Sequence, residues 1–199
     1  MRTTAQAFVV AIGCTLVAAA HALEYAPKLS LRTGGGILRN DGADRGSSAT
    51  TGGLNLVFTY FLTSRLSTGV GYKADFDLAQ GSIPLRGFDL SGRYYFWGNG
   101  TRVLRSAGAF THETQDLFLM YFGGDFSQRS YFFPAGSPDT SDLTGGFGAA
   151  NATLGADVPL SRHFEWNLEL VYSVLTFAAT DSQVKIRSTL VQTGLNYVW

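Results

Sequence analysis

The chain ends with the stretch Val191-Gln192-Thr193-Gly194-Leu195-Asn196-Tyr197-Val198-Trp199. Apolar side chains and polar or small side chains alternate along most of this stretch. The first set is Val191, Leu195, Tyr197 and Trp199, and the second is Gln192, Gly194 and Asn196. A period of two predicts a β-strand with one apolar face and one polar face, because successive side chains of a strand point to opposite sides.

The same alternation recurs along the chain between short turn signals. The pattern predicts eight strands, at Lys28 to Leu38, Leu54 to Leu62, Leu66 to Phe76, Phe88 to Phe96, Leu117 to Phe133, Phe147 to Val158, Phe164 to Ala178 and Val184 to Trp199. Short connections alternate with longer ones, and several of the segments reach the length of about 9–11 residues that a strand needs to cross a membrane. An even number of strands with short turns on one side is the rule for transmembrane β-barrels.

An aromatic last residue on such a strand is the second decisive feature. The segment that ends at Trp199 resembles the carboxy-terminal strand of bacterial outer-membrane β-barrels, and the whole chain resembles their small OmpA/OmpX/OmpW-like class. The resemblance implies an all-β fold, an antiparallel up-and-down transmembrane β-barrel of eight strands. It also implies transit through the periplasm, insertion into the outer membrane by the barrel-assembly machinery, and contact with outer-membrane lipids and lipopolysaccharide.

The amino terminus has the order of residues expected for a secretory signal peptide. Arg2 is the only charge before a mostly apolar run from Ala7 to Ala20, and Ala20-His21-Ala22 follows as an A-x-A-like cleavage site. We therefore expect residues 1–22 to be removed and residues 23–199 to form the barrel domain. Cys14 is the only cysteine, so the mature chain has no disulfide and no thiol chemistry.

The charge balance gives no sign of a nucleic-acid partner. The chain carries 15 Lys and Arg residues against 15 Asp and Glu residues, so there is no basic excess. No group of His, Cys, Asp and Glu has the spacing of metal ligands, and no motif indicates a cofactor.

One segment, Thr101 to Asp116, does not fit the eight-strand pattern because its alternation is poor. A ninth strand there would place the two ends of the barrel on opposite sides of the membrane. We therefore expect an irregular or partly helical connection on the periplasmic side. The alternative is a turn at Gly123-Gly124-Asp125, which would split the following segment and give ten strands.

Aromatic residues gather near the ends of the predicted strands, beside the predicted periplasmic turns. They are Tyr60, Phe61, Tyr94, Tyr95, Phe96, Trp97, Phe164, Trp166, Tyr197 and Trp199. Such a belt is typical of the membrane interface of outer-membrane barrels. A soluble β-sandwich or a lipocalin-like barrel would also give short alternating strands, but its aromatic residues would lie mid-strand in the core.

If the apolar face meets lipid, the charged residues of the other face point into the barrel. They are Lys73, Asp75, Asp89, Arg93, Glu165 and Glu169. Charges inside a narrow barrel must be paired, because an isolated buried charge is very costly. We therefore expect an ion-pair network that fills the lumen, with Arg93 paired to Glu169 and Lys73 paired to Asp75 or Asp89.

Two other function classes stay open. A lipid-modifying enzyme would need a nucleophile, a base and an acid in one place, and the candidates are His112, His163 and the serine of Gly124-Asp125-Phe126-Ser127. A lipopolysaccharide- or ligand-binding barrel could use cations near the predicted extracellular strand ends, because Arg matches the geometry of phosphate. Those cations are Arg39, Arg45, Arg86, Arg129, Lys185 and Arg187, and ordinary surface solubility explains them equally well. The sequence favours a non-enzymatic envelope role or a minor permeability role.

Overall fold

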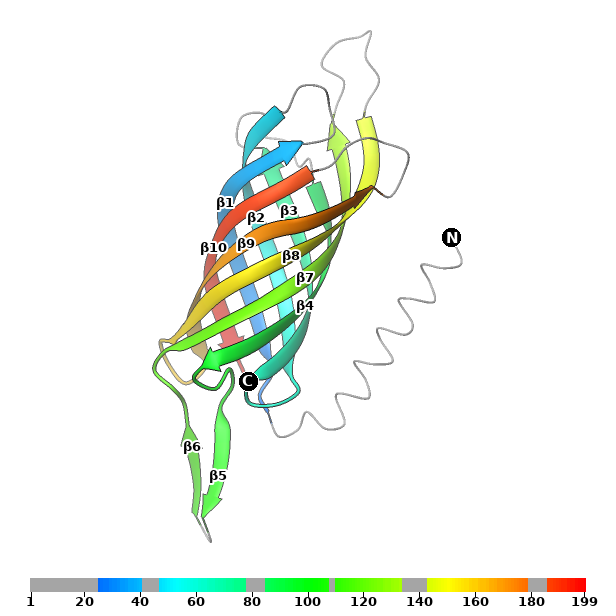
Figure 1. Cartoon of the computed structure of the whole chain (residues 1–199). Coiled ribbons are helices and arrows are strands. Elements are labelled where there is room, and N and C mark those ends of the chain that lie inside the picture. The colour runs from blue at the N-terminus through cyan, green and yellow to red at the C-terminus, as the bar shows by residue number, and fades with distance from the viewer. Residues whose placement is uncertain (1–24, 41–46, 78–84, 108–109, 134–142, 179–185) are drawn as a thin grey trace.

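Eight strands of the chain form a closed antiparallel barrel, as the computed structural model shows for residues 25–40, 47–77, 85–107, 110–133, 143–178 and 186–199 (Figure 1). Neighbouring strands follow the order β1-β10-β9-β8-β7-β4-β3-β2 around the barrel. Their bounds are β1 Lys28–Asn40, β2 Ser47–Phe61, β3 Leu66–Asp77, β4 Leu85–Trp97, β7 Leu119–Phe133, β8 Leu143–Pro159, β9 Phe164–Ala178 and β10 Ile186–Val198. The predicted eight-stranded up-and-down barrel is confirmed.

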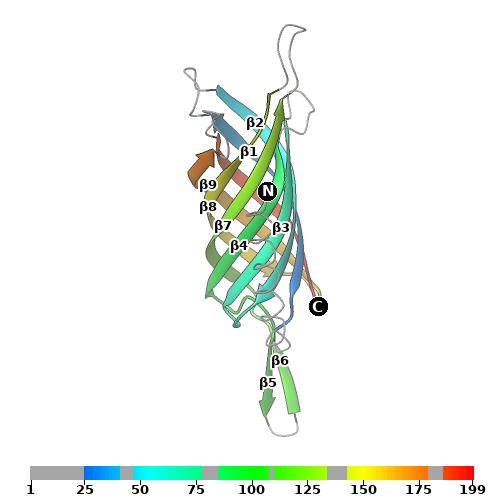
Figure 2. The ribbon, with the colours of Figure 1, turned by 90° about the vertical axis from the view of Figure 1, so that its right-hand side faces the viewer.

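The remaining two strands form a hairpin that projects from one end of the barrel. They are β5, Val103–Ala107, and β6, Phe110–Thr114, and they pair only with each other among the described strands. Figures 1 and 2 place this hairpin at the end where the chain terminates, which we name the carboxy-terminal end. The expectation of an irregular or partly helical segment was therefore wrong. The alternative of ten barrel strands was also wrong, because β7 continues without a turn through Gly123 and Gly124.

Polar contacts fix the base of the hairpin to the barrel. The backbone N–H and the side-chain amide of Asn99 both donate to Asp116 Oδ2, at 2.7 and 3.0 Å, which closes the neck of the hairpin. Thr101 donates to the carbonyl of Ala26 at 3.0 Å. Gly98, at φ 75°, lets the chain turn out of β4 at this point, in a conformation that L side chains rarely adopt.

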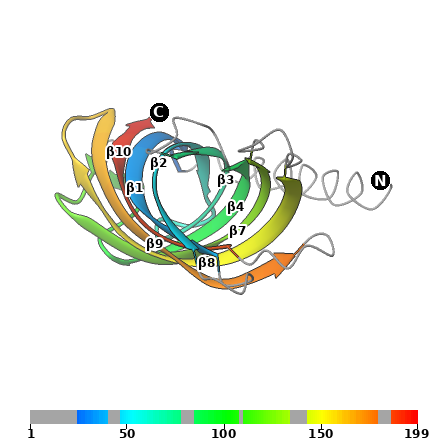
Figure 3. The same ribbon diagram turned by 90° about the horizontal axis from the view of Figure 1, so that it is seen from above.

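The two faces of the barrel wall differ sharply in polarity. On β4, the side chains of Phe88 and Leu90 point outward and are 59% and 51% exposed, whereas Asp89 between them is only 7% exposed. The strands close into a ring when viewed along the barrel (Figure 3). An apolar outside and a charged inside are the arrangement of a membrane barrel, and they exclude a soluble sandwich or lipocalin-like barrel, whose core is apolar. No helix within the described ranges is long and apolar enough to cross a membrane.

Local irregularities in the wall shape the lumen. The register between β8 and β9 shifts beside Asn151, and Val174 and Leu175 consequently both face outward. At Gly36 of β1, an added Cβ would lie 2.8 Å from Leu190 Cα on the neighbouring strand. This position therefore needs glycine, because the backbones of β1 and β10 lie very close together there. Such a close approach fits the tight curvature of a small barrel.

Candidate functional site

Inward-facing charges meet halfway along the lumen at Glu169, on β9. Its Oε1 accepts a hydrogen bond from Arg32 Nη1 at 2.9 Å, and its Oε2 lies 2.9 Å from Arg93 Nη2. Tyr121 also donates its hydroxyl to Oε2 at 2.7 Å. These partners come from β1, β4 and β7, so the contacts cross the lumen. We name Glu169, Arg32, Arg93 and Tyr121 the central network.

A second group of polar side chains lies nearer the carboxy-terminal end, around Asp157 of β8. Asp157 Oδ1 accepts from Asn167 at 2.7 Å and from Asn196 at 3.0 Å. Its Oδ2 accepts from the hydroxyl of Tyr95 at 2.9 Å and lies 3.4 Å from Lys28 Nζ. Lys28 also forms an ion pair with Glu165, so one buried cation serves two buried carboxylates. These residues are the basal network.

Aromatic rings close the lumen at this end. Phe61, Tyr95, Leu119 and Tyr121 form one buried cluster. Lys28 Nζ lies 5.4 Å from the ring centre of Phe61, and this contact adds a favourable cation–π interaction. Phe61 and Tyr95 were expected in the outer aromatic belt, and that prediction was wrong. Both occupy inward positions, where they fill the base of the lumen.

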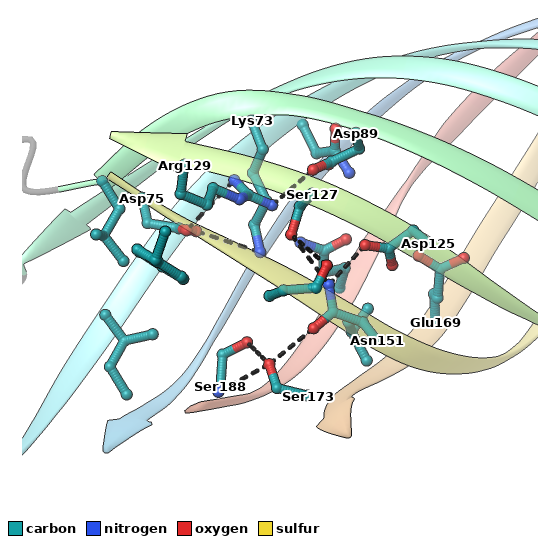
Figure 4. Close-up of a pocket in the computed structure, with 17 residues that line it drawn as sticks. Lys73, Asp75, Asp89, Asp125, Ser127, Arg129, Asn151, Glu169, Ser173 and Ser188 are labelled. Atoms are coloured by element: carbon teal, nitrogen blue, oxygen red, sulfur yellow. Dashed lines mark hydrogen bonds and ion pairs between the residues drawn. The ribbon is translucent and has the colours of Figure 1, made fainter. Parts of the chain in front are cut away.

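A third group lies beyond the central network, toward the opposite end of the barrel. Arg129 contacts Asp89 at 2.9 Å and Asp75 at 3.8 Å, and Lys73 Nζ lies 3.4 Å from Asp75 (Figure 4). These side chains line a cavity of about 30 Å³. An apolar cluster of Leu38, Leu85, Phe147 and Ala149 borders the cavity. The lumen is therefore layered: basal network, central network, cavity and apolar border.

The structure brings together most of the charges singled out in the sequence. Arg93 forms an ion pair with Glu169, and Lys73 forms an ion pair with Asp75, as expected. Asp89, however, contacts Arg129 rather than Lys73. Arg129 was expected to face outward toward lipopolysaccharide, and its burial in the lumen shows that this expectation was wrong.

Three charged residues of the site were missed in the sequence, namely Lys28, Arg32 and Asp157, and so was Tyr121. A signal for the first two was present. Lys28 and Arg32 alternate with Leu29 and Leu31, which the sequence places on the apolar face of the strand. The side chains of Lys28 and Arg32 therefore point to the other face, which lines the lumen.

The other aromatic residues of the expected belt lie on the outside of the barrel at the carboxy-terminal end. The outward-facing members are Tyr60, Tyr94, Phe96, Trp97, Phe164, Trp166, Tyr197 and Trp199. Their rings contact one another in places, with the centres of Tyr197 and Trp199 5.2 Å apart. Trp166 donates its indole N–H to Thr193 at 2.8 Å, so this polar atom is satisfied on the outer wall.

Three of the expected rim cations are exposed on the outer surface at the opposite end: Arg39, Arg86 and Arg187. Arg39 of β1 stands directly across from Arg187 of β10 in the strand register. Arg45 and Lys185 lie outside the described residues.

The candidate catalytic residues do not meet in the described part of the chain. Ser127 Oγ lies in hydrogen-bond contact with Asn151 at 3.3 Å and with the carbonyl of Ala149. His163 contacts the carbonyl of Val198 at 3.0 Å and stacks on Tyr197, at the end of the barrel. The side chain of His112 lies outside the described residues. Within the described ranges, no cluster of three or more His, Cys, Asp or Glu could hold a metal ion.

Comparison with solved structures supports the architecture. Neisserial surface protein A superimposes with a TM-score of 0.55 at 13% identity, covering 86% of this chain and 97% of that one. The N-terminal β-barrel domain of OprF from Pseudomonas aeruginosa gives a TM-score of 0.52 at 13% identity, covering 85% of this chain and 97% of that domain. The fold is that of a small outer-membrane β-barrel. No protein-family model matches the sequence, and no curated protein matches it.

Proposed function

We propose that this protein is a non-enzymatic structural barrel of the outer membrane, with a lumen closed to steady flow of ions. The observation that carries the proposal is the central network, in which Glu169 holds Arg32 and Arg93 across the lumen. Exposed apolar side chains on the outer wall suit contact with lipid, and an export signal and the barrel-assembly machinery would bring the chain there. The envelope role needs no cofactor.

Side chains fill the lumen of this barrel, which favours a closed lumen. The interior of an eight-stranded barrel is only wide enough for its own side chains or for one small ligand. Here the central and basal networks and the aromatic cluster occupy successive layers, and Arg32, Asn167 and Tyr95 are at most 1% exposed. A conducting path would have to cross all of these layers, so we expect the folded barrel to resist ion flow.

Conductance in planar lipid bilayers tests this proposal. We expect the wild-type barrel to show no large, steady channel. The triple variant Arg32→Ala, Arg93→Ala and Glu169→Ala removes the central network without leaving a lone buried charge. It should make brief openings more frequent, while the basal network and the aromatic cluster still prevent a steady channel. Arg86→Ala is the matched control, since Arg86 lies on the outside of the strand that carries Arg93. A large, steady open channel in the wild type would contradict the proposal.

A second candidate function is the binding of lipopolysaccharide at the rim opposite the carboxy terminus. The observation that favours it is the direct opposition of Arg39 and Arg187 on adjacent strands. An anion between these two positions would be held by two guanidinium groups. Arginine binds phosphate groups through paired hydrogen bonds, and the phosphates of lipopolysaccharide are groups of this kind.

Charge reversal at both positions tests the rim site. In the variant Arg39→Glu and Arg187→Glu, we expect the lipopolysaccharide that co-purifies with the barrel to fall by about tenfold, the effect of losing about 1.4 kcal/mol of binding. The outer-membrane permeability to dyes should rise in parallel. Arg65→Glu, in the exposed turn at the other end, should change neither quantity. Equal co-purification by the double variant and the wild type would rule this function out.

A further inference from the structure

The hairpin of β5 and β6 projects from the end of the barrel that has the short turns. At this end, residues 62–65 join β2 to β3 and residues 160–163 join β8 to β9, whereas the connections at the opposite end are residues 41–46, 78–84, 134–142 and 179–185. Short turns face the periplasm in outer-membrane barrels, so we place the hairpin in the periplasm. Trp97 of the aromatic belt precedes it in the chain, and the hairpin continues away from the barrel (Figures 1 and 2).

Polar contacts hold the root of the hairpin in one orientation. The N–H of Gly100 donates to the carbonyl of Ser64 at 2.7 Å, and Arg102 donates to the carbonyl of Val198 at 3.4 Å. These contacts add to the hydrogen bond of Thr101 described above. A surface that is ordered before binding loses less conformational entropy when a partner arrives.

The two outer edges of the hairpin have no neighbouring strand. Within the described strands, β5 and β6 pair only with each other, from Val103 opposite Thr114 to Ala107 opposite Phe110. Their register has no bulge, and neither strand contains proline or lysine, which natural sheets use to protect their edges. A two-stranded sheet alone is only marginally stable in water, and a third strand stabilises it.

The length of the turn determines which backbone groups point outward. Two residues separate Ala107 from Phe110, and a connection this short requires these two residues to exchange hydrogen bonds. Bonded and non-bonded pairs alternate along an antiparallel ladder, so the N–H and C=O groups of Thr111 and Glu113 point away from β5. Three of the five residues of β6 are Phe or Thr, which favour strands, so β6 is the better edge for a new strand.

A second copy of this chain does not suit this edge. Two copies in one membrane are related by a two-fold axis along the membrane normal, and the hairpin extends along the length of the barrel (Figures 1 and 2). Such an axis would make the two β6 strands parallel and would set each outward N–H opposite the same N–H of the other copy. A parallel ladder needs donors opposite acceptors, so the edge suits a different polypeptide.

We propose that the outer edge of β6 binds an extended segment of a periplasmic polypeptide as an added antiparallel strand. Main-chain hydrogen bonds give the affinity in this mode of recognition. The complementary row of N–H and C=O groups, at the spacing of a strand, belongs to another extended chain. A cation at the position opposite Glu113 adds to binding, because opposite charges across two strands attract.

Nuclear magnetic resonance of the isotope-labelled barrel, folded in detergent micelles, tests the proposal. The probe is the peptide acetyl-Thr-Val-Lys-Val-Thr-amide, whose lysine can lie opposite Glu113. We expect saturable shifts of the backbone amide signals of Thr111 and Glu113 at millimolar peptide. The amide signals of Leu104 and Ser106, on the outer edge of β5, should not change.

Two methylated forms of the probe separate backbone pairing from non-specific adhesion. Methyl groups on the backbone nitrogens of the lysine and the last threonine remove the N–H groups that face β6. This form should bind at least about tenfold more weakly than the parent peptide. Methyl groups on the two valine nitrogens remove N–H groups that point away from β6, so this form is the matched control and should bind like the parent.

Proline variants test the edge from the side of the barrel. Thr111→Pro removes one outward N–H, which an edge strand tolerates, and should weaken binding about fivefold. Ser106→Pro makes the same kind of change on the outer edge of β5 and should leave binding unchanged. The proposal is overturned by equal binding of the two methylated peptides, by unchanged binding to Thr111→Pro, or by no binding of the parent peptide. Amide shifts of Thr111 and Glu113 that grow with barrel concentration alone would assign the edge to a second copy and would also overturn it.

Discussion

Replacing Glu169 with leucine is expected to lower the free energy of unfolding by about 3–5 kcal/mol, the cost of leaving buried charges without their partner. Glu169 is the only acidic residue within ion-pair distance of Arg32 and Arg93 in the described part of the chain. Leucine has a similar volume but accepts no hydrogen bond, so two guanidinium groups and the hydroxyl of Tyr121 would lose their acceptor. Urea titration of the barrel in lipid vesicles, followed by tryptophan fluorescence, measures the change.

A triple variant separates the cost of a broken network from the value of the intact one. Arg32→Met, Arg93→Met and Glu169→Leu together replace every charge of the central network with an apolar side chain. Such replacements are often neutral or stabilising, because the desolvation cost of the charges disappears with them. We therefore expect the triple variant to recover most of the stability lost by Glu169→Leu. If the single variant were as stable as the wild type, the central network would not be the element that holds the lumen.

Strand periodicity was enough to predict the barrel, because the side-chain alternation of a strand is a local property. On β9, Trp166 and Leu168 lie outside while Glu165 and Glu169 lie inside, as the alternation predicted. The same rule failed where the odd-numbered and the even-numbered positions of a strand carry similar residues. On β7, Tyr121 and Phe122 are adjacent aromatics, so the sequence did not show which face Arg129 shares. The structure places Tyr121 and Arg129 together in the lumen.

The hairpin β5–β6 was beyond prediction for a different reason. Each of its strands has only five residues, which is too short for alternation to stand out from chance. Its base, moreover, depends on contacts with distant parts of the chain. Thr101 donates to the carbonyl of Ala26, a residue 75 positions away.

The pairing of charges inside the lumen was only partly predictable. Alternation indicates which residues point inward, but the height of each residue depends on the register between strands. Closure of the barrel brings Lys28 of β1 to Asp157 of β8 and to Glu165 of β9, which are 129 and 137 residues away in the sequence. No local pattern in the sequence indicates which of these distant residues meet in the lumen.

Replacing Asp157 with asparagine is expected to destabilise the barrel by about 3–5 kcal/mol, nearly as much as replacement with alanine. The carboxylate accepts from Asn167 and Asn196 on one oxygen, and from Tyr95 and Lys28 on the other. An asparagine amide has only one oxygen, and its NH₂ group would face donors in either orientation. The isosteric change therefore creates a donor–donor contact in a fully buried place. Unfolding in urea, compared with Asp157→Ala, measures the effect.

Asp125→Asn is the matched control for this prediction, since it makes the same chemical change at a carboxylate with fewer hydrogen-bond donors around it. Asp125 accepts from a single described donor, Asn151, so the new amide can keep its oxygen toward that donor. We expect its unfolding free energy to stay within about 1 kcal/mol of the wild type, the range of a single neutral hydrogen bond. Tyr95→Phe, which removes one of the four donors to Asp157, should cost about 1 kcal/mol, because Lys28 still contacts the same oxygen. Equal stability of Asp157→Asn and Asp125→Asn would show that the basal network tolerates a missing acceptor, contrary to the geometry of its four donors.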